Sequence, residues 1–117
     1  MQKYRERKRT DPKYVAQQLW YGAFTRSKQK GLEIDITVEW ITDKLLAGVC
    51  EATGSELNQL SKAFRPSLDR IVPDNGYTTN NTQVVCQMYN YAKNVFTDAE
   101  VLQMSTNMYN NRVKQGR

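Results

Sequence analysis

The sequence has no histidine among its 117 residues and only two cysteines, Cys50 and Cys86. Without histidine, a serine–histidine or cysteine–histidine nucleophile pair is excluded, and so is an imidazole base that titrates near neutral pH. Two thiolates do not complete the four-ligand Cys/His set of a structural zinc site, so we expect no structural zinc. Two cysteines also fall short of a disulfide framework, which favours a reducing, intracellular setting and therefore the cytoplasm.

Long apolar runs are missing as well. No run approaches the roughly 18 residues of a membrane span, and the N-terminus opens with charges, so membrane insertion and export are disfavoured. Motifs of the types GxGxxG, P-loop, HExxH and paired CxxC are absent. At 13.6 kDa, the chain has room for one domain with a modest core.

Positive charge is concentrated near the N-terminus. Residues 1–30 hold nine basic and two acidic side chains, so this quarter carries +7 while the remainder carries −2. A segment of this kind suits a polyanion, because each neutralised phosphate releases counterions. The alternative is a solubilising tail in front of a solvated helix face. We expect DNA as the partner, and residues 1–10 as a flexible basic arm.

The apolar pattern predicts a single α+β domain over residues 11–117. Asp11-Pro12 marks a helix start and Gly31 a helix end, and Thr37 and Gly48 bracket a second helix. Residues 32–36 alternate as a short strand or extended segment, and residues 50–64 look irregular. A β-hairpin and two further helices follow, the last one opened by a capping box at Thr97–Glu100. The predicted ranges are helices 12–29, 38–47, 87–95 and 98–112 and strands 67–71 and 83–86.

One stretch carries a spaced set of residues: Asp69-Arg70-Ile71-Val72-Pro73, then Asn81, Cys86, Asn90 and Lys93. This set resembles the HNH (His-Me finger, ββα-metal) endonuclease family, whose motif opens with Asp-His-Ile-x-Pro on the first strand of a hairpin. The segment 65–71 with Gly76-Tyr77-Thr78 is similar to a phage and bacterial branch of that family, and the similarity covers most of residues 14–108. The resemblance implies a ββα-metal finger over residues 66–95, with two helices before it and one after it.

The resemblance assigns roles to individual residues. Asp69 and Asn90 would be the ligands of one divalent ion, Mg²⁺ or Mn²⁺, and Asn81 would brace the loop between strand and helix. Two oxygen ligands suit a hard cation, since waters and phosphate oxygens complete its octahedron. Such an ion would stabilise the charge of the transition state of phosphodiester cleavage. The alternative is that Asp69 and Asn90 are ordinary turn and cap residues.

Two departures from the family pattern limit these roles. Arg70 stands where the family has its general-base histidine, and a guanidinium cannot accept a proton from water, although it can bind phosphate. Asp74, Tyr77 and Tyr89 are the remaining candidate bases. The zinc knuckle of many relatives is reduced to Cys50-x-x-Thr53 and Cys86-x-x-Tyr89. We expect the two cysteines to lie close together, as a reduced pair or a disulfide, with packing by Met88, Tyr89, Tyr91 and the tryptophans in place of zinc.

The function expected from the resemblance is a Mg²⁺-dependent DNA endonuclease, with Asp69 and Arg70 as its catalytic residues. The alternative is a catalytically inactive module of the same fold that binds nucleic acid or a host protein; a phage-encoded chain would act in the host cytoplasm. The oligomeric state, monomer or homodimer, stays open. We expect the DNA phosphates to be contacted by Lys93, Arg65, Lys28, Lys30, Arg5, Arg7, Lys8 and Arg9.

Overall fold

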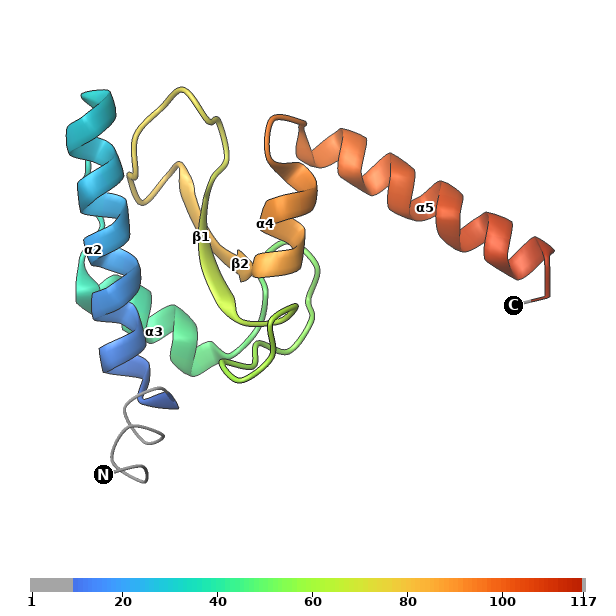
Figure 1. Ribbon diagram of the computed structural model, residues 1–117, viewed down its shortest axis with the longest axis horizontal. Coiled ribbons are helices and arrows are strands. Elements are labelled where there is room, and N and C mark those ends of the chain that lie inside the picture. Colours follow the sequence, from blue (N-terminus) through green and yellow to red (C-terminus); the bar gives the residue numbers. More distant parts are fainter. Residues whose placement is uncertain (1–9, 117) are drawn as a thin grey trace.

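Four helices and one two-stranded antiparallel sheet make up residues 10–116, the part of the chain that the computed structural model describes (Figure 1). The α+β class predicted from the sequence is confirmed. The first nine residues of the predicted basic arm lie outside the described range. No described helix is both long enough and apolar enough to cross a bilayer. The elements are α2 (Pro12–Lys30), α3 (Val38–Ala47), β1 (Pro66–Arg70), β2 (Thr82–Cys86), α4 (Gln87–Lys93) and α5 (Asp98–Lys114).

The ends of α2 and α3 are set by the capping residues that the sequence indicated. The Asp11 side chain accepts a hydrogen bond from the Lys13 N–H, and Gly31 ends α2 in the left-handed region at φ 64°. The Thr37 hydroxyl accepts from the Trp40 N–H, and Gly48 ends α3 at φ 74°. Glycine favours both ends because it enters this region without the Cβ penalty of other residues.

β1 and β2 form a hairpin, and α4 begins directly after β2. The register runs from Pro66 opposite Cys86 to Arg70 opposite Thr82. One face of the hairpin packs Leu68 and Val84 against Ala16 and Ala23 of α2, in a cluster that Ile36, Ile41 and Tyr77 complete. A second cluster holds Cys50, Val85, Cys86 and Tyr89. The hairpin is therefore held from both sides, by α2 and α3 on one and by α4 on the other (Figure 1).

Residues 32–36 are extended and make one isolated parallel bridge, from Ile34 to Tyr77, instead of a strand. The Tyr77 N–H donates to the Glu33 carbonyl at 2.8 Å, and the Tyr77 carbonyl accepts from the Asp35 N–H at 3.0 Å. The chain at Gly76 lies against the Glu33 backbone so closely that a Cβ there would collide with the Glu33 carbonyl. This contact fixes the hairpin loop beside α2.

α4 is shorter than predicted and α5 is longer. α4 ends at Lys93 because Asn94 takes a φ of 37°, which a helix cannot continue through. The capping box of α5 forms as predicted: Thr97 accepts from the Glu100 N–H, and Glu100 accepts from the Thr97 N–H. α5 has no buried residue and projects away from the rest of the fold (Figure 1).

Candidate functional site

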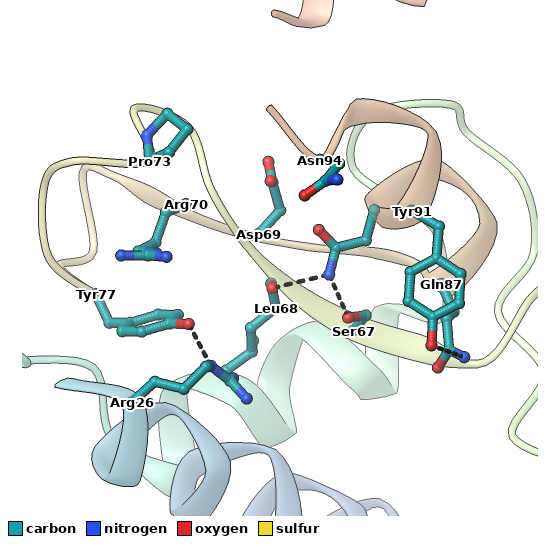
Figure 2. Close-up of a pocket in the computed structure, with 11 residues that line it drawn as sticks. Arg26, Ser67, Leu68, Asp69, Arg70, Pro73, Tyr77, Gln87, Tyr91 and Asn94 are labelled. Carbon is teal, nitrogen blue, oxygen red and sulfur yellow. Dashed lines mark hydrogen bonds between the residues drawn. The ribbon is translucent and has the colours of Figure 1, made fainter. Parts of the chain in front are cut away.

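A cleft of about 630 Å³ lies over β1, between α2 and α4. Its walls come from four parts of the chain: Arg26 of α2, the strand β1, the hairpin loop at Pro73 and Tyr77, and the cleft side of α4 (Figure 2). Three of the predicted site residues line it together: Asp69, Arg70 and Asn90. Successive side chains of a strand point to opposite faces, so Asp69 lies toward α4 while Arg70 lies toward Tyr77 and α2 (Figure 2).

Asp69 is a buried carboxylate with a full set of neighbours. It lies directly opposite Gln83 in the hairpin, and the Gln83 side-chain amide donates to Oδ2 at 2.9 Å. The Lys93 ammonium donates to Oδ1 and to Oδ2, at 3.0 Å each. A buried carboxylate needs such partners, because an unpaired charge in the interior is costly. Of its roughly four lone-pair sites, these bonds leave one on Oδ1.

Lys93 is placed differently from the expectation. Its ammonium is buried, and besides Asp69 it donates to the carbonyls of Arg70 at 2.8 Å and Ile71 at 3.1 Å. Three N–H groups shared among these acceptors leave no donor for an external phosphate. The expected phosphate contact by Lys93 is therefore corrected: this lysine joins α4 to the end of β1 and neutralises Asp69.

The side-chain nitrogen of Asn90 is used in hydrogen bonds to β1, and its side-chain oxygen is left for further contacts. Its side-chain N–H₂ donates to the Ser67 hydroxyl at 2.7 Å and to the Leu68 carbonyl at 3.3 Å. Because a carbonyl only accepts, the Leu68 bond fixes which end of the amide faces the strand. Within the described residues, the Asn90 Oδ1 accepts no hydrogen bond, so it remains available on the cleft side of α4.

The cleft brings together the two side chains that were predicted to hold the ion, Asp69 and Asn90. Asp69 Oδ1 and Asn90 Oδ1 are hard oxygen donors on neighbouring walls, the type that Mg²⁺ and Mn²⁺ bind. Over residues 10–116 there is no group of three or more His, Cys, Asp or Glu side chains placed to hold a metal. The donor set thus fits an ion that keeps water or phosphate oxygens in most positions, and such an ion would share the Asp69 carboxylate with Lys93.

Two guanidinium groups flank one buried tyrosine ring on the other side of the cleft. Arg70 lies over the Tyr77 ring at 5.1 Å from its centroid, and Arg26 lies 5.5 Å from the same centroid. The Arg26 Nε also donates to the Tyr77 hydroxyl at 2.7 Å (Figure 2). Cation–π contact with the ring holds both guanidinium groups in place. Arg70 Nη1 is buried and has no partner among the described residues, which leaves a strong donor unsatisfied beside the cleft.

None of the three candidate bases is well placed to take a proton from water. Asp74 is exposed and does not line the cleft. The Tyr77 hydroxyl lines the cleft but accepts a hydrogen bond from a permanently charged guanidinium. Tyr89 lies in the second core cluster, and its hydroxyl donates to Asp98 at 2.6 Å. Burial, together with this bond and the charge of Asp98, raises the pKa of Tyr89 well above its usual value.

Asn81 braces the hairpin loop between β1 and β2, not a loop between strand and helix as expected, because α4 begins directly after β2. Its side-chain oxygen accepts from the Val72 N–H at 2.9 Å, and its N–H₂ donates to the Val72 carbonyl at 3.1 Å and the Gly76 carbonyl at 2.9 Å. Its own carbonyl accepts from the Ile71 N–H at 2.8 Å. One buried amide therefore closes the loop that carries Pro73 and Tyr77 into the cleft wall.

The two cysteines are a reduced, buried pair, as predicted. They share the second cluster, and both are free thiols. Burial raises the pKa of Cys86, and the nearby Cys50 raises it further. Burial also opposes ionisation of Cys50, but hydrogen bonds from Thr53 and from nearby backbone N–H groups lower its pKa below the usual value. Of the aromatic and sulfur side chains expected here, only Tyr89 joins the cluster; Met88 and Tyr91 are exposed, and both tryptophans pack with the first cluster.

The other predicted phosphate contacts do not line the cleft. Lys28 and Lys30 are exposed on the last turn of α2, and the Arg65 Nε donates to the Ser61 carbonyl. Arg5, Arg7, Lys8 and Arg9 lie outside the described residues. From the sequence, Arg26 was not identified as a residue of the cleft. Gln83 was also not identified as a hydrogen-bond partner of the Asp69 carboxylate. Gln83 could have been found by pairing the hairpin strands, whereas no sequence pattern joins Arg26 to Tyr77 across 51 positions.

Comparisons of the chain with models of protein families, with curated proteins and with solved structures found no match.

Proposed function

We propose that the chain is an HNH-like DNA endonuclease whose cleft receives one phosphodiester group and nicks it with a single divalent ion. The observation that carries the proposal is that one cleft is lined by two residues with oxygen donors, Asp69 of β1 and Asn90 of α4, and by two guanidinium groups, those of Arg26 and Arg70. A hairpin with a braced loop, followed directly by a helix, supports the resemblance to the ββα-metal finger.

The charge of the cleft supports an anionic occupant. Two cationic side chains, Arg26 and Arg70, line the cleft together with one carboxylate, Asp69, and that carboxylate is already paired with the buried Lys93. The unsatisfied Arg70 Nη1 is a donor suited to a phosphate oxygen, to which arginine binds in a bidentate manner. A contact of this kind gives affinity for the backbone and little sequence information.

The roles of the cleft residues depend on whether each side chain can bind the ion, bind the phosphate or accept a proton. Asp69 and Asn90 would hold the ion, which when bound would act as a Lewis acid at the phosphate. Arg70 and Arg26 would bind and orient the phosphate and stabilise its added charge. No described cleft residue is a competent general base, so the proton of the attacking water would pass to bulk solvent. General-base catalysis contributes about 10²–10⁴-fold, so we expect a slow enzyme.

One observation favours a second function, a non-catalytic nucleic-acid-binding module. The Lys93 ammonium already supplies a cation to both oxygens of Asp69. If this ion pair persists when DNA and Mg²⁺ are present, the cleft binds phosphate through Arg26 and Arg70 without cleaving it.

Two assays on the full chain separate these functions. Conversion of supercoiled plasmid to the nicked form is measured with Mg²⁺ or Mn²⁺ for the wild type, for Asp69→Asn and Asn90→Ala, and for the exposed control Asn110→Ala. Nicking that needs the metal and is lost only in the two site variants supports the enzyme. DNA binding without any metal-dependent nicking supports the module.

The second assay measures binding to duplex DNA against salt concentration. Arg26→Gln and Arg70→Gln should each weaken binding and lower the salt slope by about one, because each removes one phosphate contact. Lys62→Gln is the matched control, since Lys62 is exposed and away from the cleft. Equal losses in all three variants, or no binding by the wild type, would reject the cleft as a DNA site.

A further inference from the structure

α5 carries an apolar face that the described chain covers only at its first turn, where Val101 and Asp98 contact the rest of the fold. Its apolar side chains beyond the first turn are between 54% and 69% exposed: Leu102, Met104, Met108, Tyr109 and Val113. Exposing this much apolar side chain along one helix is unfavourable in a monomer, and contiguous exposed patches mark interaction sites. Only Val101, in the first turn, packs against the second core cluster.

The apolar side chains lie on one half of the helix. At about 100° per residue, the five exposed apolar positions fall within roughly half of the circumference, with Ser105 near the middle. The opposite half carries the uncharged polar residues Gln103, Asn107, Asn110 and Asn111. This division is the pattern of a helix that packs against a partner along its length.

The charges of α5 identify the partner. Residues 101–111 are uncharged, and the charged side chains lie only in the two end turns: Asp98 and Glu100 in the first, Arg112 and Lys114 in the last. Asp98 and Arg112 fall near the midline of the apolar half, seven residues on either side of Ser105. A helix with this arrangement is complementary to itself when a second copy runs in the opposite direction.

We propose that α5 pairs with α5 of a second copy of the chain in an antiparallel, two-fold arrangement centred on Ser105. In this register Asp98 of each copy lies opposite Arg112 of the other, and Leu102 lies opposite Met108. The small Ser105 side chain lets the two backbones approach at the axis. The contact is isologous, so it closes at two copies and does not extend into a filament.

The same register accounts for two more exposed apolar residues. Val95 and Phe96, which immediately precede α5, are 77% and 53% exposed. The antiparallel pairing brings the last turn of the second copy, with Val113, to this end of the helix. The dimer is independent of the proposed nuclease function, although it would present two clefts to one DNA.

Sedimentation equilibrium of the full chain at physiological ionic strength tests the proposal. The wild type should be a dimer that dissociates on dilution. Met108→Glu should raise the dissociation constant by about tenfold or more, because it buries an unpaired charge. Asn107→Glu, on the polar half, is the matched control and should leave the dissociation constant unchanged. A monomeric wild type, or equal effects of the two variants, would overturn the proposal.

Charge exchange tests the direction of pairing. Asp98→Lys and Arg112→Glu should each weaken the dimer, and the double variant should restore it, because the exchanged charges again face each other. Asp98 also accepts from Tyr89, so circular dichroism must show that each variant is folded. A second measurement does not depend on Asp98: Ser105→Cys should form an intermolecular disulfide on mild oxidation, and Asn110→Cys should not. A double variant weaker than both single variants, or equal cross-linking at positions 105 and 110, would contradict the antiparallel arrangement.

Discussion

The Lys93 ammonium lies 3.0 Å from both carboxylate oxygens of Asp69, and both side chains are almost fully buried. This ion pair joins α4 to β1 at the floor of the cleft. It therefore bears on stability and function at once, since the same carboxylate is the proposed ligand of the divalent ion.

Removing Lys93 should be costly, because it leaves a buried carboxylate without its counter-charge. Lys93→Met should lower the free energy of unfolding by about 3–5 kcal/mol, measured by urea denaturation. The double variant Asp69→Asn/Lys93→Met should recover part of this loss, since it no longer buries a charge. Lys44→Ala, which breaks the more exposed pair between Lys44 and Glu51, should cost less than about 1 kcal/mol. Equal losses for the two lysine variants would contradict the role given to the buried pair.

Asn81 should contribute to stability through both ends of its amide. Asn81→Ala leaves the Val72 N–H and the two carbonyls it serves without partners and should cost about 1–3 kcal/mol. Asn81→Asp should cost at least as much, because a carboxylate cannot donate to the Val72 and Gly76 carbonyls. Denaturant unfolding measures both, with the exposed Asn110→Ala expected within about 0.5 kcal/mol of the wild type. A stable Asn81→Asp variant would show that the donor bonds do not hold the loop.

Gly76 and Gly22 should respond in opposite directions to the same added methyl group. A Cβ at Gly76 would meet the backbone of Glu33, which cannot move without displacing residues 32–36, so Gly76→Ala should destabilise by about 1–3 kcal/mol or more. A Cβ at Gly22 would meet only the flexible end of Arg26, at 3.3 Å. Gly22→Ala should therefore gain about 0.5–1 kcal/mol from its helical position. Thermal unfolding that shows the two variants shifted alike would contradict the close approach at Gly76.

The Tyr89–Asp98 hydrogen bond should give stability a dependence on alkaline pH. Burial, the bond to Asp98 and the Asp98 charge raise the pKa of Tyr89 in the folded state. An unfolded tyrosine ionises near pH 10, so above that pH the unfolded state loses its proton first and the folded state is progressively destabilised. Tyr89→Phe should cost about 1–2 kcal/mol at neutral pH and should lose stability less steeply above pH 10.

The control for this alkaline effect is Tyr91→Phe. Tyr91 is exposed, and its hydroxyl accepts from the Gln87 side chain. This variant removes a hydroxyl from the same helix without touching the Tyr89–Asp98 bond, so the loss of stability above pH 10 that Tyr89 causes should persist. Identical slopes for the wild type and Tyr89→Phe would show that Tyr89 does not ionise differently in the two states.

Local signals predicted the elements of the fold well. Asp11-Pro12, Thr37, Gly31, Gly48 and the box at Thr97 each set a helix end by contacts within a few residues. Where the sequence left alternatives open, the deciding contact was distant. Alternation at residues 32–36 predicted a short strand or an extended segment, and the segment is extended, because its partner, the chain at Gly76 and Tyr77, offers pairing at Ile34 alone.

In the candidate site, too, the features set by local sequence were predictable and those set by distant contacts were not. The hairpin and its helix bring Asp69, Arg70 and Asn90 to one cleft, a grouping that the family resemblance implied. The burial of Lys93 was not predictable from its position near the end of a helix, where lysine is ordinarily exposed. The role of Arg26 in the cleft was also not predictable from the sequence, because it depends on the packing of α2 beside Tyr77. The last helix was predicted from its capping box, whereas the exposure of its apolar residues was not addressed from the sequence.

Anomalous diffraction from crystals soaked in Mn²⁺ tests the central claim most directly. We predict one anomalous peak in the cleft, coordinated by an Asp69 carboxylate oxygen and the Asn90 side-chain oxygen, and absent in Asp69→Asn crystals soaked in the same way. No peak in the cleft, with Lys93 still bound to both oxygens of Asp69, would contradict the metal-dependent nuclease.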